Sequence, residues 1–441
     1  MLKSITLEKI YLFYVILLAA RATLFTSDMD FRSNPVGVGL LLVLCIHTFI
    51  KHKISLQNKN LVILYAILTI WTVLHYLTDI EFKIMPYLIL YINITVGYSL
   101  VKIFGNKLYE KTTQYITYLT GISLILWMIM HVIGIGFFES IGFMQPASST
   151  SVASLLIFNV PNIHIYEGKG IGPFMRNCGF AWEPGLFASF ICFAIYFNLL
   201  IKKRIKRNRS FYILTLGLFS TFSTTGYSAF LLIIANYFIL QNSKKSTQIL
   251  YIIVGIPTFL YIMNLPFMAD KIKKEDESEN FLYNNNQLTS EIESEKITMT
   301  VRRWEGIIMD YLNIQDRPIL GYGTINNSYV NTHISSYLLS SNGIVSTFAR
   351  FGIVLGLLIN IVFIRNTNYI DKLFRQKYCM FYILYMTLSI SYSFTTLALM
   401  IALCSSNLWI SKSQKYIKWT ILHFSQSLQS ATIVKKLLPE R

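Results

Sequence analysis

The chain has 441 residues, of which 54% are hydrophobic and 14% charged, and its mean hydropathy is +0.49. These values exclude an ordinary soluble globular protein and indicate a polytopic membrane protein. The net charge of +17 could point to nucleic acid, but the basic residues are spread over short loops and form no single basic domain. We therefore expect no nucleic-acid partner.

Apolar runs recur along the chain between short polar breaks, and each approaches the roughly 20 residues that cross a bilayer as a helix. The pattern predicts an all-α fold with about twelve transmembrane helices. The first run lacks an A-x-A cleavage site, so it is interpreted as a span and not as a signal peptide. In chain order the predicted spans are 10–25, 36–50, 61–77, 86–104, 115–138, 184–201, 211–224, 226–240, 249–268, 343–364, 378–394 and 396–410.

The distribution of charge predicts the orientation of these spans. With a cytoplasmic N-terminus, 26 of the 39 Lys and Arg residues but only 4 of the 22 Asp and Glu residues fall in inside loops. This asymmetry places both termini and the basic turn 202–209 in the cytoplasm. The tail 411–441 mixes basic and apolar residues, so we expect it to lie along the inner leaflet.

Two outside loops are much longer than the others, and long loops in a compact fold usually carry function. They divide the chain into recognisable parts. These are five helices in 1–138, a first outer loop in 139–183, four helices in 184–268, a large outer loop with a helical cap in 269–342, three helices in 343–410 and a basic cytoplasmic tail in 411–441.

Residues 211–240 are flanked by positive charge on both sides, so they should cross the membrane an even number of times. Two full spans need about 40 residues, and this hairpin has too few. We expect its polar tip, STFSTTGY, to stop below the outer surface and line a polar recess. Two ordinary kinked spans, with Ser and Thr bonded to their own backbone, are the alternative.

The segment RNCGFAWEPG closes the first outer loop. Pro184 suits the first turn of the following helix, and Glu183 lies near its N-cap, where a carboxylate is favoured by the helix dipole. Capping alone would not explain Arg176 and Trp182 beside it. An Arg at the outer interface suits a phosphate because its planar fork binds two oxygens, and an aromatic ring at that depth suits a lipid headgroup or a sugar face.

The second outer loop contains a helical pattern between Arg302 and Asp310 that predicts a structured cap. Pro318 then ends the helix, and a tight turn follows at the GYG of residues 321–323. This GYG is similar to a potassium-channel filter, but it lacks a pore helix and follows charged residues, so a channel is rejected. His333 precedes the next span by about three turns.

The sequence shows no pattern typical of a metal or redox site. The histidines and the five cysteines have no metal-ligand spacing. Asp28 and Asp30 form a D-x-D, which some sugar transferases use to hold a metal; a short solvated turn is the alternative. We expect no metal and no cofactor.

The outer-face stretch 176–187, together with R-R-W, P-I-L-G-Y-G, S-N-G and F-G-I-x-x-G in 302–356, resembles the bacterial O-antigen and capsular polysaccharide polymerases. The related O-antigen ligases share this architecture, which resembles the glycosyltransferase C class. The similarity in topology extends over most of the chain. The ligase pattern places a His shortly before an Asn, whereas His333 is followed by Ile334.

The resemblance implies a metal-independent glycosyl transfer at the outer face of the bacterial cytoplasmic membrane, in which a glycan leaves undecaprenyl diphosphate for a lipid-linked repeat unit. A flippase and a chain-length regulator are the implied partners, beside membrane lipids. The reaction needs a cationic cradle for the diphosphate and a base near the acceptor hydroxyl. The residues chosen are Glu183, His333 and Arg176 for catalysis, and Arg176, Arg302, Arg303, Arg317, Arg350, Trp182 and Trp304 for binding the substrate.

Two other functions fit part of the pattern. A ligase that passes the glycan to another acceptor would have the same architecture. A polysaccharide flippase or exporter would also have about twelve spans, but it should show two similar halves and charges inside the membrane. Here the charges cluster in the outer loops and no repeat is visible.

Overall fold

The structure is a computed structural model. It describes residues 6–21, 35–78, 82–144, 151–155, 157–161, 174–240, 299–300, 303–323, 338–339, 342–374, 376 and 379–410. The predicted span 249–268 and the predicted tail 411–441 lie outside these residues.

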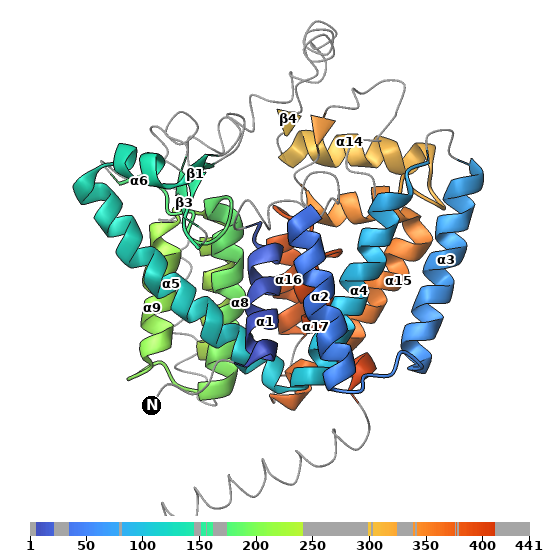
Figure 1. Ribbon diagram of the computed structural model, residues 1–441, viewed down its shortest axis with the longest axis horizontal. Helices are drawn as coiled ribbons and strands as arrows, with labels where there is room; N and C mark the ends of the chain where they lie inside the picture. The colour runs from blue at the N-terminus through green and yellow to red at the C-terminus, as the bar shows by residue number, and fades with distance from the viewer. Residues whose placement is uncertain are drawn as a thin grey trace, which may run out of the picture.

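Helices dominate the described part of the chain, and they stand side by side in a bundle (Figure 1). They occupy the predicted ranges with shifted ends. Their bounds are α1 Leu7–Ala19, α2 Pro35–Lys51, α3 Lys59–Thr78, α4 Ile84–Phe104, α5 Lys107–Ile133, α6 Ile135–Ile141, α8 Pro184–Lys202, α9 Arg209–Ser220, α10 Thr224–Ala235 with the π-helical turn η1 Asn236–Leu240, α14 Arg303–Asp316, α15 Gly343–Leu373, α16 Met380–Ser389 and α17 Ala398–Trp409.

Five helices of the described residues are long and apolar enough to cross a membrane, namely α3, α4, α5, α8 and α15. This confirms a multi-pass membrane protein by helix length and composition. The central helix is α8, because 89% of its most apolar window is buried inside the protein, against 22% for α3. A helix that is apolar all round is expected at such a buried position.

The described parts of both long loops lie at the same end of the bundle (Figure 1). Helices α6 and α14 lie at this end, and α14 runs across the ends of the upright helices. The turn between α8 and α9 lies at the opposite end. The two loops thus share one face of the molecule, as their predicted topology requires.

Two helical hairpins are too short to span a bilayer. Helices α9 and α10 have 12 residues each, and α16 and α17 have 10 and 12. At 1.5 Å per residue α9, α16 and α17 are each about 15–18 Å long, against roughly 30 Å of hydrocarbon, whereas η1 continues α10 as far as Leu240. The Oγ1 of Thr225 and the Oγ of Ser391 are 2.8 Å apart and buried, so the two hairpins meet near their tips.

The second short hairpin corrects a prediction. Residues 378–394 were expected as one span, but α16 ends at Ser389 and residues 390–397 are not helical. The segment from Ser389 to Thr396 has Ser or Thr at five of its eight positions, and their hydroxyl groups compete with the backbone for hydrogen bonds. The Oγ1 of Thr395, for example, bonds to that of Thr347 on α15 at 2.9 Å.

Helix α15 is interrupted at Gly352, where φ is +72° and ψ is 170°. The turn that follows α14 enters this break. The Ile353 amide donates to the Pro318 carbonyl at 2.7 Å, and the Tyr322 amide donates to the Ala349 carbonyl at 2.9 Å. A side chain at Gly352 would have its Cβ 2.0 Å from the Ile319 carbonyl oxygen, so only glycine fits. This docking fixes the C-terminal end of α14 on the bundle.

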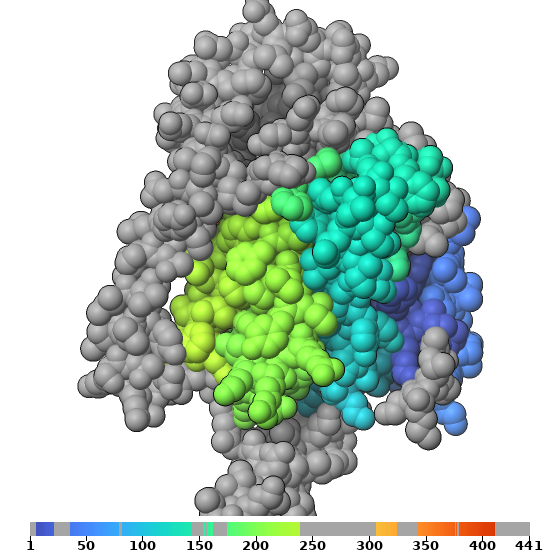
Figure 2. Space-filling view, turned by 90° about the vertical axis from the view of Figure 1, so that its left-hand side faces the viewer, coloured from blue at the N-terminus to red at the C-terminus, as the bar shows by residue number. Residues whose placement is uncertain are grey.

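Short strands add to the predicted all-α fold. β1 (Phe143–Met144), β2 (Ser151–Ser154) and β3 (Asn159–Pro161) form an antiparallel sheet, and β4 (Met299–Thr300) pairs in parallel with β5 (Leu338–Leu339). Figure 2 shows α5 and α9 packed side by side on one face of the bundle.

Candidate functional site

Residues 174–183 form a segment with a turn at Gly179 that precedes α8, at the end of the bundle where the long loops lie. Hydrogen bonds fix it on two sides. The Asn159 amide donates to the Gly179 carbonyl at 2.7 Å, and the Asn177 amide donates to the Ser220 carbonyl at 2.9 Å. The segment therefore lies between the small sheet and the tip of the α9–α10 hairpin.

Arg176 is half-buried, and its Nε donates to the carbonyl oxygen of Thr221 at 3.0 Å. Thr221 follows the last residue of α9, where the final carbonyls of a helix have no partner within the helix. A guanidinium has five N–H donors, and this bond uses one of them. The hairpin tip therefore sets the orientation of the fork.

Asn177, beside Arg176, is fully buried and holds the segment in place with its side chain. Its Nδ2 donates to the Ser220 Oγ at 3.0 Å. Its Oδ1 accepts from the Gly179 amide at 2.8 Å and from the Ser123 Oγ of α5 at 3.0 Å. A buried Asn side chain that makes these three hydrogen bonds has few other conformations open to it. Asn177 therefore fixes the backbone position of the adjacent Arg176.

The tip of the α9–α10 hairpin is polar, as predicted, but protein fills the recess. The Ser220 Oγ donates to the Gly217 carbonyl and the Thr221 Oγ1 to the Leu218 carbonyl, both at 2.7 Å. The same two residues offer their own carbonyls to Asn177 and Arg176. These Ser and Thr hydroxyls are bonded to the backbone of their own helix, as the second alternative expects, and the depth of the tip in the membrane stays a prediction.

Glu183 occupies the N-cap position of α8, with Pro184 as the first helical residue. Its backbone is extended, with φ −147° and ψ 155°, and its side chain accepts no hydrogen bond from the first turn. Capping by the carboxylate is therefore not the role of this residue, although its charge lies where the helix dipole favours an anion. The side chain is half-buried at the outer end of the bundle.

Cys178 lies between these two charged residues in the chain and is fully buried. Burial raises the pKa of its thiol, the charge of Arg176 lowers it, and the charge of Glu183 raises it further. The thiol stays protonated, so it cannot act as a nucleophile.

Trp182 links this segment to the end of α1. Its amide donates to the Ala20 carbonyl at 3.2 Å, and the guanidinium carbon of Arg21 lies 5.2 Å from the centroid of its ring. Arg21 was missed by the sequence analysis because it falls inside the predicted span 10–25. An Arg near the outer end of an apolar span was the signal that could have identified it.

A second group of predicted residues gathers at the turn after α14. The guanidinium carbon of Arg317 lies 5.1 Å from the centroid of the Tyr322 ring, and the Tyr322 hydroxyl donates to Asp316. The Gly323 amide donates to the Arg350 carbonyl at 2.8 Å. Arg317 and Arg350 therefore flank one turn, whereas Arg176, Trp182 and Glu183 belong to the segment before α8.

The other predicted site residues are only partly covered. Arg303 and Trp304 begin α14, but their side chains are not described. Arg302, His333, Asp28 and Asp30 lie outside the described residues. Among the residues that the structure does describe, no three His, Cys, Asp or Glu side chains could hold a metal ion together.

No protein-family model matches the sequence, and no curated protein or solved structure is significantly similar to it.

Proposed function

We propose that this protein is a polysaccharide polymerase of the bacterial cytoplasmic membrane. It joins oligosaccharide repeat units linked to undecaprenyl diphosphate at the periplasmic, outer face. In this proposal the chain has about twelve membrane segments of the glycosyltransferase C type, the short arms of the two hairpins among them, with both termini in the cytoplasm. The O-antigen or capsule pathway supplies its substrates through a flippase, and a chain-length regulator acts with it.

The observation that carries the proposal is the arrangement of the segment before α8. Arg176 is anchored through Nε to Thr221, Glu183 ends the same segment, and Trp182 stands between them in the chain. A cation, a carboxylate and an aromatic ring at the outer end of a membrane bundle are the groups that a lipid-linked diphosphate sugar requires.

The reaction needs one bond to form and one to break. The acceptor hydroxyl oxygen attacks the anomeric carbon of the donor glycan, and the bond from that carbon to the diphosphate oxygen breaks. The electron pair leaves with undecaprenyl diphosphate, whose charge Arg176 neutralises. The hydroxyl proton passes to Glu183, with His333 as the alternative base.

A ligase is the second candidate, because it would use the same donor and the same cradle with a different acceptor. An exporter is the third, and it should show two similar halves and charges inside the membrane.

Deletion of the protein separates these functions when the surface glycan is examined on a gel. Loss of the ladder with one repeat unit retained supports the polymerase. Accumulation of long, lipid-linked, unattached polymer points to the ligase. Single repeat units trapped on the cytoplasmic side point to an exporter. An unchanged ladder contradicts all three.

A further inference from the structure

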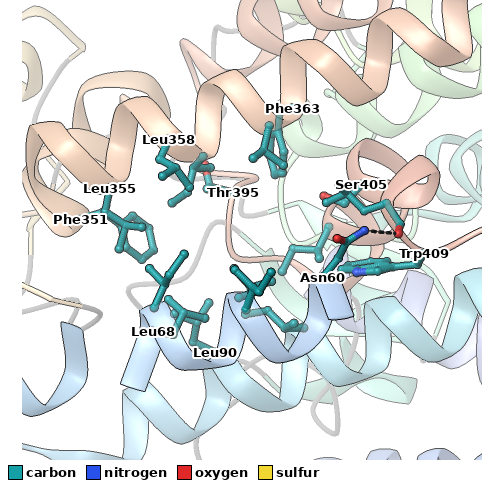
Figure 3. Close-up of a pocket in the computed structure, with 18 residues that line it drawn as sticks. Asn60, Leu68, Leu90, Phe351, Leu355, Leu358, Phe363, Thr395, Ser405 and Trp409 are labelled. Atoms are coloured by element: carbon teal, nitrogen blue, oxygen red, sulfur yellow. Dashed lines mark hydrogen bonds between the residues drawn. The ribbon is translucent and has the colours of Figure 1, made fainter. Parts of the chain in front are cut away.

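An apolar groove of about 230 Å³ lies between α3, α4, α15 and α17. Figure 3 shows Leu68 on α3 and Leu90 on α4 facing Phe351, Leu355 and Leu358 on α15 across it. Of its 18 lining residues, the polar ones are Asn60, Thr395 and Ser405. The lining suits hydrocarbon and gives a glycan almost no hydrogen-bond partners.

The groove exists because α3 is attached to the bundle at its two ends. Near its start, the Asn60 Nδ2 donates to the Leu408 carbonyl at 2.8 Å, a bond visible in Figure 3. Near its end, the Trp71 Nε1 donates to the Leu320 carbonyl at 2.9 Å. Between these points Ile63 and Leu358 line the groove and are also 47% and 40% exposed. The groove is therefore open at the surface of the bundle.

The dimensions suit a linear chain. The groove runs along α3 from Asn60 to Leu68 and along α15 from Leu355 to Phe363, which is about 12 Å of helix in each case. Three of the four helices that line it, α3, α4 and α15, are long and apolar enough to cross a membrane.

The outer end of the groove adjoins the turn that carries two of the predicted substrate-binding arginines. Trp71 packs against Phe351 with 5.2 Å between ring centroids and also bonds to this turn. Arg350 precedes Phe351, and Arg317 stacks on Tyr322 in the same turn. The apolar groove therefore ends at the turn that carries Arg317, whose charge complements a lipid with one long chain and an anionic head.

We propose that the α3–α15 groove holds a segment of the polyprenyl chain of a lipid substrate, next to the phosphate, which lies at the turn between Arg317 and Arg350. The identity of the lipid rests on the proposed function. The groove is distinct from the segment of Arg176. A reaction between two lipid-linked glycans needs two lipid-binding sites, one for the donor and one for the acceptor.

Site-specific photocrosslinking tests the proposal without any glycan. The protein carries a photoreactive phenylalanine analogue at Leu358 or Ile63, inside the groove, or at Val354, which is 63% exposed on α15 and does not line it. Each variant is placed in nanodiscs of phosphatidylglycerol with a minor fraction of undecaprenyl phosphate. We expect the ratio of polyprenyl to phospholipid adducts to be about tenfold higher at Leu358 and Ile63 than at Val354.

Two further arms identify the groups involved. Replacing undecaprenyl phosphate with undecaprenol, or introducing Arg317→Gln with Arg350→Gln, should remove most of this enrichment. Leu358→Trp should fill the groove and abolish enrichment at Ile63, whereas Val354→Trp should not.

Equal adduct ratios inside and outside the groove overturn the proposal, because the groove then holds bulk lipid. Enrichment that survives loss of the phosphate and of both arginines overturns the headgroup assignment. None of these measurements involves polymer synthesis. If polyprenyl adducts are enriched in the groove but deletion of the protein leaves the ladder intact, the proposed function is refuted and the groove proposal stands.

Discussion

The Nε of Arg176 lies 3.0 Å from the carbonyl oxygen of Thr221, and this bond joins the outer loop to the tip of the short hairpin. The adjacent Asn177 makes the parallel contact to Ser220 through backbone and side chain. Two features that the sequence suggests separately, a charged outer motif and a shallow polar hairpin, are therefore one structural unit. The hairpin supplies the carbonyl that orients the cation.

Arg176→Lys should lower polymer production by roughly 100-fold although the charge is kept, because an ammonium cannot bond Thr221 and grip a diphosphate bidentately at once. The measurement is the glycan ladder, normalised to the amount of protein in the membrane. Arg204→Lys, at an exposed position of the opposite turn, is the matched control and should leave the ladder unchanged. Equal ladders from both variants would contradict the role of Arg176.

Gly352→Ala should destabilise the protein by roughly 1–3 kcal/mol, because the positive φ is strained for alanine and the new methyl group meets the Ile319 carbonyl. The measurement is unfolding of the purified protein in detergent. Gly39→Ala on α2 is the control, since a Cβ there meets nothing within 4 Å. Similar stability of both variants would show that the turn after α14 does not dock in the break of α15.

Much of the fold can be predicted because the bilayer limits the choices. Helices occur within the predicted ranges that the structure describes, with shifted ends and a break after Ser389, and both long loops lie at one end. Hydropathy, however, measures only how well a segment suits lipid. It did not reveal that α16 stops at Ser389, because a run of hydroxyls in a buried hairpin depends on partners such as Thr347.

The candidate site was only partly predictable for the same reason. Arg176, Trp182 and Glu183 were identified from residue type and position in the chain. Arg21 was not, since its contact with Trp182 arises only when α1 ends at Ala19 and the chain turns there. The separation of Arg317 and Arg350 from Arg176 likewise depends on the docking of the turn at Gly352. Such contacts join residues far apart in sequence, which periodicity cannot indicate.

The Glu8 carboxylate should stabilise the contact between the start of α1 and the end of α2 in a pH-dependent way. It lies 2.6 Å from Lys51 Nζ and 3.0 Å from His52 Nε2, and the bond to Lys51 lowers its pKa to about 2. A lowered pKa gives stability that is complete above the ordinary carboxyl pKa of 4.5 and is lost as the pH falls toward 2.

The difference in unfolding free energy between wild type and Glu8→Gln should therefore be constant from pH 8 to about pH 5 and shrink below that. Its size should be about 0.2–1 kcal/mol, as for other accessible ion pairs, and high salt should reduce it. Unfolding in detergent across this pH range is the measurement. A difference that persists undiminished near pH 2 would contradict the assignment to this carboxylate.

Glu183→Gln distinguishes chemistry from capping. Its side chain accepts no hydrogen bond from the first turn of α8, so the loss of a side-chain cap cannot contribute to its effect. The variant should unfold within about 0.5 kcal/mol of wild type, which is the usual range for substitutions away from such features. If the carboxylate accepts the acceptor proton, polymer should nevertheless fall by roughly two orders of magnitude, because glutamine cannot take a proton.

Glu183→Asp provides the comparison, since it keeps the base but shortens its reach, and it should retain more polymer than Glu183→Gln. The ladder and the amount of protein in the membrane are measured for both variants. Full-length polymer from Glu183→Gln at normal protein levels would exclude this residue as the base. The proton acceptor would then have to be sought in the second outer loop, where His333 is the remaining candidate.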